Sequence, residues 1–490
     1  MIRLATSLLL AAVVSGVHLR TAAQGAPVAT PESQGMDSTA LANLVTYGAN
    51  VKMDSLVVMR NGQIVAEAYY APFRAEMKHR INSATKAVVG ALAGIAIARG
   101  DLPPARTPIA GVFPELANAS DARWREMTLQ HLLDMTSGIA WEEPLADGVP
   151  RTMLEMTRSR DWAAFVLARP FAQAPGAGFH YNSGNAHLLS AALTRRTGES
   201  AEAYAAKHLF GPLGITQHRW LRDPQGVSTG GWGLYLRTRD MALLGQLYMQ
   251  QGEWQGRALI PREWAARAFA PQVDMGFPGW RYADMWWGHP RLGAYMMVGF
   301  NRQVVVVLPQ QRIVAAVTGR GMHPLENLAE QLQRAVRSDS PLPENAQAQA
   351  ALRDRIAAVA VPKPLPGPEG VQPVVRQATY ALDDNPLGVR EFSFDFTASP
   401  PTYRMRLRTR DIVAPIGLEG VLAEGADEGA PLFTAARWQD PRTLAFRQIW
   451  AEEGATVDYV LKLEGDAVEV SRTNDFGART VVRGQRITAP

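Results

Sequence analysis

Two β-hairpin patterns lie far apart in the chain and constrain its fold more than any other feature. The first covers residues 55–70, where two β-rich runs flank Asn61-Gly62, a pair that tolerates the positive φ angles of a tight turn. In the second, the β-branched runs at 304–308 and 313–317 flank a turn at 309–312. The chain therefore has strands near both ends of a long segment.

Helical patterns fill the space between the two hairpins, for example at residues 161–168, 186–197 and 240–250. Strands at both ends with helices between them imply a sheet whose strands come from distant parts of the chain. We predict an α/β chain of the α+β type, with an antiparallel sheet flanked by helices and a further all-β domain at the C-terminus.

A change of composition marks the boundary of that C-terminal domain. Residues 341–373 are rich in proline around an Ala/Gln/Arg-rich helical stretch and form a connector. Beyond it the hydrophobic period becomes 2, as in the alternating phenylalanines of residues 392–396. We predict a first domain at 24–340 and an antiparallel barrel or curved sheet at 374–490.

The first 23 residues are typical of a secretory signal peptide. Arg3 gives a positive start, residues 4–17 are mostly apolar, and small residues precede a cleavage site after Ala23. The apolar stretch is shorter than the roughly 20 residues that span a bilayer, which disfavours an uncleaved anchor. We expect a mature soluble protein, without a stable membrane anchor, that is periplasmic or secreted.

Composition removes several classes of chemistry. The absence of cysteine excludes a thiol nucleophile, disulfides and cysteine-based metal sites, and the nine histidines show no ligand spacing, so we expect no metal and no cofactor. Without the signal peptide the formal charge falls from +4 to about +2, and no Lys/Arg run is present, which argues against nucleic acid. The expected partner is a small molecule, and the sequence leaves the oligomeric state open.

A serine and a lysine at the start of an apolar helix carry the strongest chemical signal. Lys86, one of only six lysines, follows Ser83 by three positions, and the helix runs to about Arg99. This spacing puts hydroxyl and amine on one helix face, where the amine can take the hydroxyl proton. Burial and the positive end of the helix dipole lower the pKa of such an amine, and the free N–H of Ser83 can bind an oxyanion. The alternative is a surface helix start with Ser83 as cap and Lys86 in solvent.

Further along, a loop with Tyr181-Asn182-Ser183 leads into a helix, and Tyr181 can relay a proton. This stretch resembles the second motif of the penicillin-recognising serine hydrolases, written Tyr-x-Asn in their class C β-lactamase branch. The resemblance covers roughly residues 50–335 and is nearest to the esterases and 6-aminohexanoate-oligomer hydrolases. Because the chain has Tyr-Asn-Ser, either Asn182 or Ser183 takes the place of the motif asparagine.

The third family motif, Lys-Thr-Gly or His-x-Gly, maps onto Met297-Val298-Gly299. The resemblance implies that Gly299 lets the substrate approach its strand and that the N–H of Phe300 completes the oxyanion hole. Met297 replaces the cation that helps to hold the substrate carboxylate in β-lactamases and DD-peptidases, which argues against both as the main activity.

The substrate-binding residues are predicted partly from the resemblance and partly as aromatic walls of a cleft, although tryptophans are more often core residues. They are Asn182, Ser183, Gly299, Gln303, Trp141 and Trp287. A rival nucleophile, Ser228 in Gly226-Val227-Ser228-Thr229-Gly230, matches a nucleophile elbow but lacks the strand before it and the helix after it.

These features predict an exported serine hydrolase that cleaves esters or linear amides through an acyl-enzyme. Lys86 accepts the Ser83 proton directly or through Tyr181, and Tyr181 protonates the leaving group. One alternative is a β-lactamase or D-amino-acid-specific peptidase that holds its substrate carboxylate with an arginine such as Arg302. The other is a catalytically silent binding or scaffold protein of the same fold.

Overall fold

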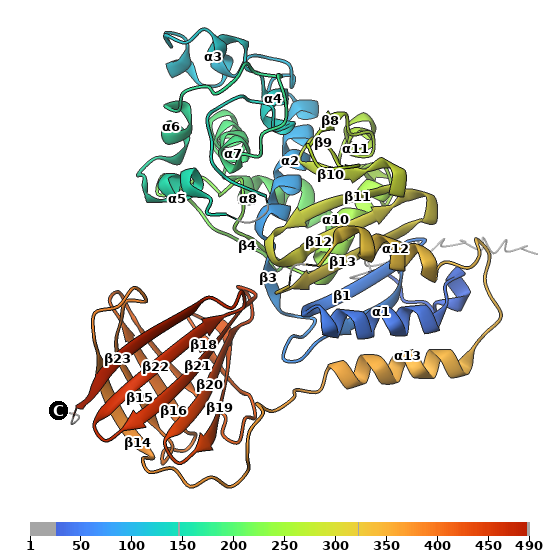
Figure 1. The fold of residues 1–490 in the computed structure, drawn as a ribbon. Helices are drawn as coiled ribbons and strands as arrows, with labels where there is room; N and C mark the ends of the chain where they lie inside the picture. Colours follow the sequence, from blue (N-terminus) through green and yellow to red (C-terminus); the bar gives the residue numbers. More distant parts are fainter. Residues whose placement is uncertain (1–25, 146–147, 322, 488–490) are drawn as a thin grey trace, which may run out of the picture.

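The structure is a computed structural model that describes residues 26–145, 148–321 and 323–487 (Figure 1). The predicted signal peptide at residues 1–23 lies outside the described residues. Within the described ranges, no helix is both long and apolar enough to cross a membrane.

One eight-stranded antiparallel sheet organises the first domain. Its strand β1 pairs with β2 across the Asn61-Gly62 turn and with β13 on the other side, where Leu56 lies opposite Val317. Both turn residues have positive φ, 51° and 78°. The prediction of a sheet built from distant parts of the chain is therefore confirmed. In sheet order the strands are β2 (Gln63–Tyr69), β1 (Met53–Arg60), β13 (Ile313–Gly319), β12 (Gln303–Leu308), β11 (Ala294–Gly299), β10 (Trp286–His289), β9 (Arg281–Ala283) and β8 (Val273–Asp274).

Helices cover this sheet, because β1, β12 and β13 are buried along their whole length. The α10 helix packs on β12 and β13 through Gly245, which lies directly against Val305 and Val314. A second group of helices packs around α1, which contacts β1 (Figure 1). The bounds of these helices are α1 (Ser38–Asn50), α10 (Thr238–Met249), α12 (Leu325–Ala335) and α13 (Ala346–Val359).

The region between the hairpins is mostly helical and surrounds α2. This helix is buried on every side from Thr85 to Ala96, as its apolar sequence predicts, and ends at Gly100 with φ 77°. It contacts α7, α8 and β11. The elements are β3 (Lys78–Arg80), α2 (Thr85–Arg99), α4 (Leu129–Leu133), α5 (Arg151–Arg158), α6 (Trp162–Leu167), α7 (Ser183–Thr197), α8 (Ala201–Ala205), β4 (Arg219–Trp220) and β5 (Leu234–Arg237).

The connector predicted at 341–373 contains α13, and this helix packs on α1 and β2. Because of these contacts α13 belongs to the first domain, and the spacer between the domains begins after Val359. The proline-rich residues 360–376 carry no helix or strand.

The C-terminal domain is an almost closed antiparallel barrel of ten strands, which we call the barrel (Figure 1). Its end strands β17 and β18 lie against each other, with Gly425 packed on Ala414 and Pro415. Phe392, Phe394 and Phe396 point into its core, as their alternation predicts. The strands are β14 (Gln377–Leu382), β15 (Val389–Asp395), β16 (Thr402–Leu407), β17 (Asp411–Pro415), β18 (Ala423–Asp427), β19 (Ala430–Asp440), β20 (Thr443–Trp450), β21 (Ala455–Glu464), β22 (Ala467–Asn474) and β23 (Arg479–Ile487).

The barrel is docked on the first domain through a small apolar cluster. Phe73 and Met77, which precede β3, are buried against Phe433, Ile449 and Ala451 of the barrel. Burying such side chains stabilises the contact by roughly 1.5–3 kcal/mol for each large one. This apolar cluster therefore holds the two domains together close to β3, the strand that leads to the start of α2.

Candidate active site

Ser83 and Lys86 face each other at the start of α2. Ser83 lies in a 3-10 turn, Asn82–Ala84, that leads into the helix, and it is half-buried. The Nζ atom of Lys86 donates a hydrogen bond to the Oγ atom of Ser83 at 3.0 Å and another to the carbonyl oxygen of Gly231 at 2.7 Å. The predicted pair is thus brought together, and the surface-helix alternative does not fit a lysine that is 1% exposed.

The environment of Lys86 favours its neutral form. Complete burial lowers the pKa of its amine from 10.5 to about 8, because the charged form loses its hydration, while the carboxylate of Glu143 opposes this shift. An amine with such a pKa can accept a proton near neutral pH.

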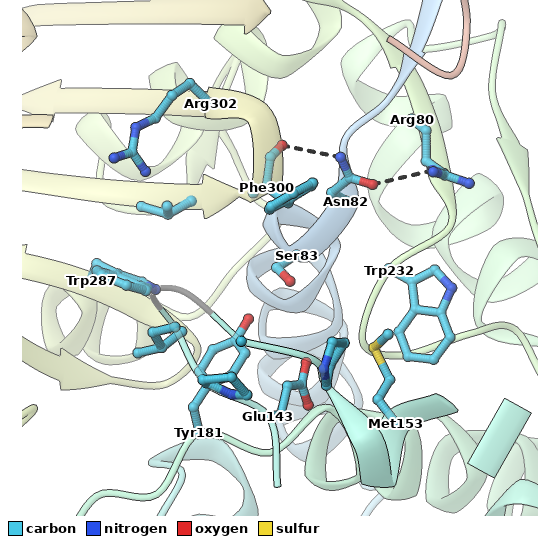
Figure 2. A pocket seen from close by; sticks show the side chains of 16 residues that line it. Arg80, Asn82, Ser83, Glu143, Met153, Tyr181, Trp232, Trp287, Phe300 and Arg302 are labelled. Carbon is cyan, nitrogen blue, oxygen red and sulfur yellow. Dashed lines mark hydrogen bonds between the residues drawn. The ribbon is translucent and has the colours of Figure 1, made fainter. Parts of the chain in front are cut away.

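Tyr181 lies on the other side of the lysine. The Nζ atom of Lys86 stands over the Tyr181 ring, 4.7 Å from its centroid, and Figure 2 shows the tyrosine hydroxyl directed toward Ser83. Burial, and to a smaller degree the Glu143 carboxylate, raise the pKa of Tyr181, and its interaction with Ser83 opposes this rise. Tyr181 is therefore a neutral hydroxyl that can donate its proton.

Two backbone N–H groups next to Ser83 can receive an oxyanion. The first is that of Ser83 itself, since the first N–H groups of a helix have no acceptor within the helix. The second belongs to Phe300, directly after β11. A Cβ atom on Gly299 would lie 2.2 Å from the carbonyl oxygen of Ile81, so only glycine allows β11 to approach the Ser83 turn this closely.

Asn82, which sequence analysis did not single out, links these two segments. Its Nδ2 donates to the carbonyl oxygen of Phe300 at 3.1 Å, and its Oδ1 accepts from Nε of Arg80 at 3.1 Å (Figure 2). Asn82 has φ 48°, a left-handed conformation that asparagine tolerates better than most residues. Its position directly before Ser83 is the only signal that the sequence offers.

The site opens into a cavity of about 420 Å³ whose walls are mostly apolar (Figure 2). Ser83 and Tyr181 lie at the cavity surface, together with Gly299, Phe300 and Trp287 from the predicted set. The full lining is Arg80, Asn82, Ser83, Glu143, Pro144, Leu145, Gly148, Pro150, Met153, Tyr181, Trp232, Trp287, Val298, Gly299, Phe300 and Arg302.

Four residues predicted to bind substrate lie behind the cavity wall. Asn182 caps α7 by accepting from the N–H of Asn185, and Ser183 donates its hydroxyl to Glu143. Gln303 is buried and donates to the carbonyl oxygen of Gly319 at 2.7 Å. Trp141 is buried and donates its Nε1 to Glu143 at 2.7 Å. Each of these side chains has a hydrogen-bond partner inside the protein and none of the four lines the cavity, which favours a supporting role, so their contact with substrate stays a prediction.

Glu143 is a second site residue that sequence reasoning missed. Its carboxylate accepts from the N–H of Ser183 at 2.8 Å, and it lines the cavity beside Tyr181 (Figure 2). It therefore ties the loop that carries Tyr181 to the loop at 142–145 and places a negative charge near Lys86. No spacing rule connects it with Ser83 or Tyr181, so the sequence gives no signal for it.

Within the part of the chain that the structure describes, neither the rival nucleophile nor a metal cluster competes with this site. Ser228 is fully buried, and its Oγ accepts from the N–H of Glu202, so it is not on an exposed elbow. Among residues 26–145, 148–321 and 323–487, no three His, Cys, Asp or Glu side chains gather where they could hold a metal ion.

Comparison with known proteins agrees with the resemblance seen in the sequence. The profile of the family described as Beta-lactamase matches residues 41–338. A 6-aminohexanoate-dimer hydrolase of Paenarthrobacter ureafaciens is 24% identical over 254 residues, which cover 48% of this chain and 64% of that protein. The chain thus spans less than two thirds of the length of this relative.

Solved structures share the fold of the first domain. A Bacillus anthracis protein assigned as a 6-aminohexanoate-dimer hydrolase superposes with a TM-score of 0.54 at 21% identity, covering 64% of this chain and 86% of its own. A Bacteroides dorei protein assigned as a β-lactamase gives 0.52 at 17% identity, covering 62% and 100%. The predicted fold class is confirmed.

Proposed function

Since this chain belongs to the Beta-lactamase family, we propose that it is an exported serine hydrolase that cleaves carboxylic ester or linear amide bonds through an acyl-enzyme on Ser83. The observation that carries the proposal is the 3.0 Å contact between the Lys86 Nζ and the Ser83 Oγ, made by an amine whose pKa burial lowers to about 8. A nucleophile with a neutral base within hydrogen-bond distance is the minimum that acyl transfer requires.

In the acylation step, the Oγ atom of Ser83 attacks the substrate carbonyl and its proton passes to Nζ of Lys86. The direct contact supports Lys86 as the first acceptor, without a relay through Tyr181. The oxyanion that forms lies against the N–H groups of Ser83 and Phe300, where each well-placed donor is worth about 2.7–4 kcal/mol in the transition state.

The leaving group then departs with a proton, which the hydroxyl of Tyr181 supplies from the cavity wall. Lys86 then passes the proton that it took from Ser83 to Tyr181, which restores the Tyr181 hydroxyl. In deacylation the same groups act in reverse. A water molecule attacks the acyl carbon and gives its proton to Tyr181, whose own proton passes to Lys86. Lys86 then returns this proton to the Ser83 oxygen as the acyl bond breaks, so that Ser83 is released as the free hydroxyl.

The cavity favours small acyl groups without a carboxylate. Its walls include Leu145, Met153, Trp232 and Trp287, and among the described residues Glu143 is the one that places a carboxylate on them. A negatively charged substrate would be repelled by that carboxylate, whereas neutral esters and linear amides are not. The relative named a 6-aminohexanoate-dimer hydrolase supports a linear amide as one substrate class.

The alternative of a β-lactamase or D-amino-acid-specific peptidase needs a cation that faces Ser83. Arg302 lines the cavity, but Figure 2 shows its guanidinium directed away from Ser83, and its Nε donates to the carbonyl oxygen of His323. Arg80 is engaged by Asn82 and by Glu453 of the barrel. These contacts favour the esterase or amidase.

The test is a screen of p-nitrophenyl esters, linear amides and β-lactams with wild type and Ser83→Ala. We expect ester hydrolysis and labelling of Ser83 by a fluorophosphonate, both lost in the variant. Undiminished activity in Ser83→Ala contradicts the assignment, and nitrocefin turnover above ester turnover supports the β-lactamase. If the wild type neither turns over substrate nor reacts with the phosphonate, the chain is a silent binding protein. N-terminal sequencing of the mature protein tests export, with cleavage after Ala23 as the expected result.

A further inference from the structure

The barrel inserts two neighbouring carboxylates into the first domain beside the active site. They belong to Glu452 and Glu453 in the 451–454 loop, which joins β20 and β21. Glu452 is buried and pairs with Lys78 and Arg219, each at 3.0 Å. Its backbone carbonyl accepts from the N–H of Arg80 at 2.7 Å, so the loop is bonded to the strand that leads into Ser83.

Glu453 begins a chain of polar contacts that ends at the oxyanion-binding turn. Its carboxylate pairs with Nη1 of Arg80 at 2.7 Å and accepts from the hydroxyl of Tyr235. Arg80 donates to the Oδ1 of Asn82, and Asn82 donates to the carbonyl oxygen of Phe300. The chain runs from the barrel to the backbone of Phe300 through three side chains, each of which holds the next.

This series of polar contacts holds the two backbone segments whose N–H groups are proposed to bind the oxyanion. Asn82 directly precedes Ser83 and holds a left-handed φ, so its side-chain contacts fix the direction of the Ser83 N–H. The Phe300 carbonyl begins a turn in which Asn301 and Arg302 also have positive φ, 62° and 61°. Such a turn is strained for residues other than glycine and persists only where neighbours hold it.

A second barrel segment touches the same turn. The ring of Phe476, between β22 and β23, lies 5.3 Å from the ring of Phe300, which lines the cavity, and the two side chains are about half exposed. Gly454 lies near the carbonyl oxygen of Gly319 and the side chain of Gln303, the residue that pairs with Gly299. The barrel therefore contacts the turn at 299–303 from two directions.

We propose that the barrel is a working part of the active site, and that Glu453 is a positioning residue which holds the oxyanion-binding turn through Arg80 and Asn82. The proposal rests on the proposed function, because it assigns the barrel a role in the same acyl transfer. A barrel that only braced the first domain would need its apolar contact around Phe73 and would gain nothing from a polar chain that ends at Phe300.

The test uses the full-length chain with Glu453→Gln and, as a matched control, Glu424→Gln. Glu424 is also a barrel carboxylate at the interface, where it pairs with Arg74 at 2.7 Å, but it has no connection to Asn82 or Phe300. We expect Glu453→Gln to lower kcat for a p-nitrophenyl ester about tenfold with KM within a factor of two, because transition-state contacts are misaligned and ground-state binding is not. We expect Glu424→Gln to keep wild-type kcat, and both variants to unfold within about 3 °C of the wild type.

A double-mutant cycle with Asn82→Ala separates positioning from general damage. If Glu453 acts through Asn82, Glu453→Gln lowers kcat less than twofold further in the Asn82→Ala background. Additive losses, equal losses in Glu453→Gln and Glu424→Gln, or wild-type kcat in Glu453→Gln would each overturn the proposal. Fluorophosphonate labelling of Ser83 in the wild type checks the proposed function separately, so a failure of the barrel's role is distinct from a protein without activity.

Discussion

The Nζ atom of Lys86 stands over the ring of Tyr181, 4.7 Å from its centroid, while it donates to the Ser83 hydroxyl at 3.0 Å. The sequence left open whether Lys86 acts directly or through Tyr181. In this arrangement the amine contacts the Ser83 hydroxyl itself, and the Tyr181 hydroxyl, which also faces Ser83, is the group that we propose protonates the leaving group.

Replacement of Tyr181 by Phe is therefore expected to affect amides much more than activated esters. A nitrophenolate leaves without protonation, whereas an amine leaving group needs the proton, and general acid catalysis contributes 10²–10⁴-fold. We expect kcat/KM to fall less than about tenfold for a p-nitrophenyl ester and more than about a hundredfold for a linear anilide. Equal losses on the two substrates would place Tyr181 in the activation of Ser83 instead.

The pH dependence of ester hydrolysis reports on Lys86. Only its neutral form accepts the Ser83 proton, so kcat/KM should rise with pH and reach half its maximum near the lowered pKa of about 8. Glu143 opposes the lowering, so Glu143→Gln should move this midpoint to lower pH. Rates measured from pH 6 to 10 on a neutral ester decide the matter, and an unchanged or higher midpoint in Glu143→Gln contradicts the assignment of the base.

Lys86 should also make the stability of the fold depend on pH. Its pKa is lower in the folded state than the value of 10.5 in the unfolded chain, so folding releases a proton between about pH 8 and 10.5. The unfolding free energy of the wild type should therefore rise with pH in this window, by on the order of 3 kcal/mol in full, relative to Lys86→Met. Urea unfolding at pH 7.5 and 9.5 measures the difference. The exposed Lys207→Met is the control, and a constant gap between wild type and Lys86→Met would refute the buried-amine description.

Gly299 should be irreplaceable for reasons of space. A methyl group there meets the carbonyl oxygen of Ile81 at 2.2 Å and would push β11 away from the Ser83 turn. Gly299→Ala is expected to lose about 1–3 kcal/mol of unfolding free energy by overpacking and at least a hundredfold in kcat. Gly178→Ala is the matched control, since a methyl group there meets no atom within 4 Å. Wild-type turnover in Gly299→Ala would show that Phe300 does not bind the oxyanion.

Local signals carried most of what could be predicted from the sequence. The positive φ angles at Asn61 and Gly62 follow from residue type, and the Ser83-Lys86 contact follows from helix geometry, which fixes side chains three positions apart on one face. Both are properties of a few consecutive residues.

Features set by packing between distant segments could not be predicted in this way. Asn182, Gln303 and Trp141 lie next to motif positions, but their side chains turn inward to cap a helix, hold a strand end and fix Glu143. Glu143 and Glu453 reach the site through tertiary contacts for which no sequence spacing exists. The sequence therefore predicted the positions of the motif residues more reliably than the directions in which the neighbouring side chains point.

The pairing of β1 with β13 also determines how late in protein synthesis this site can form. The Ser55 and Thr318 hydroxyls that meet across it are 263 residues apart in the chain. A ribosome delivers Ser83 early, yet the turn that carries Phe300 and the loop that carries Glu453 emerge far later, and closing so long a loop is slow. On the proposed function, Ser83 is therefore made before the site around it is complete, and hydrolysis would begin only once the barrel has been made and docked.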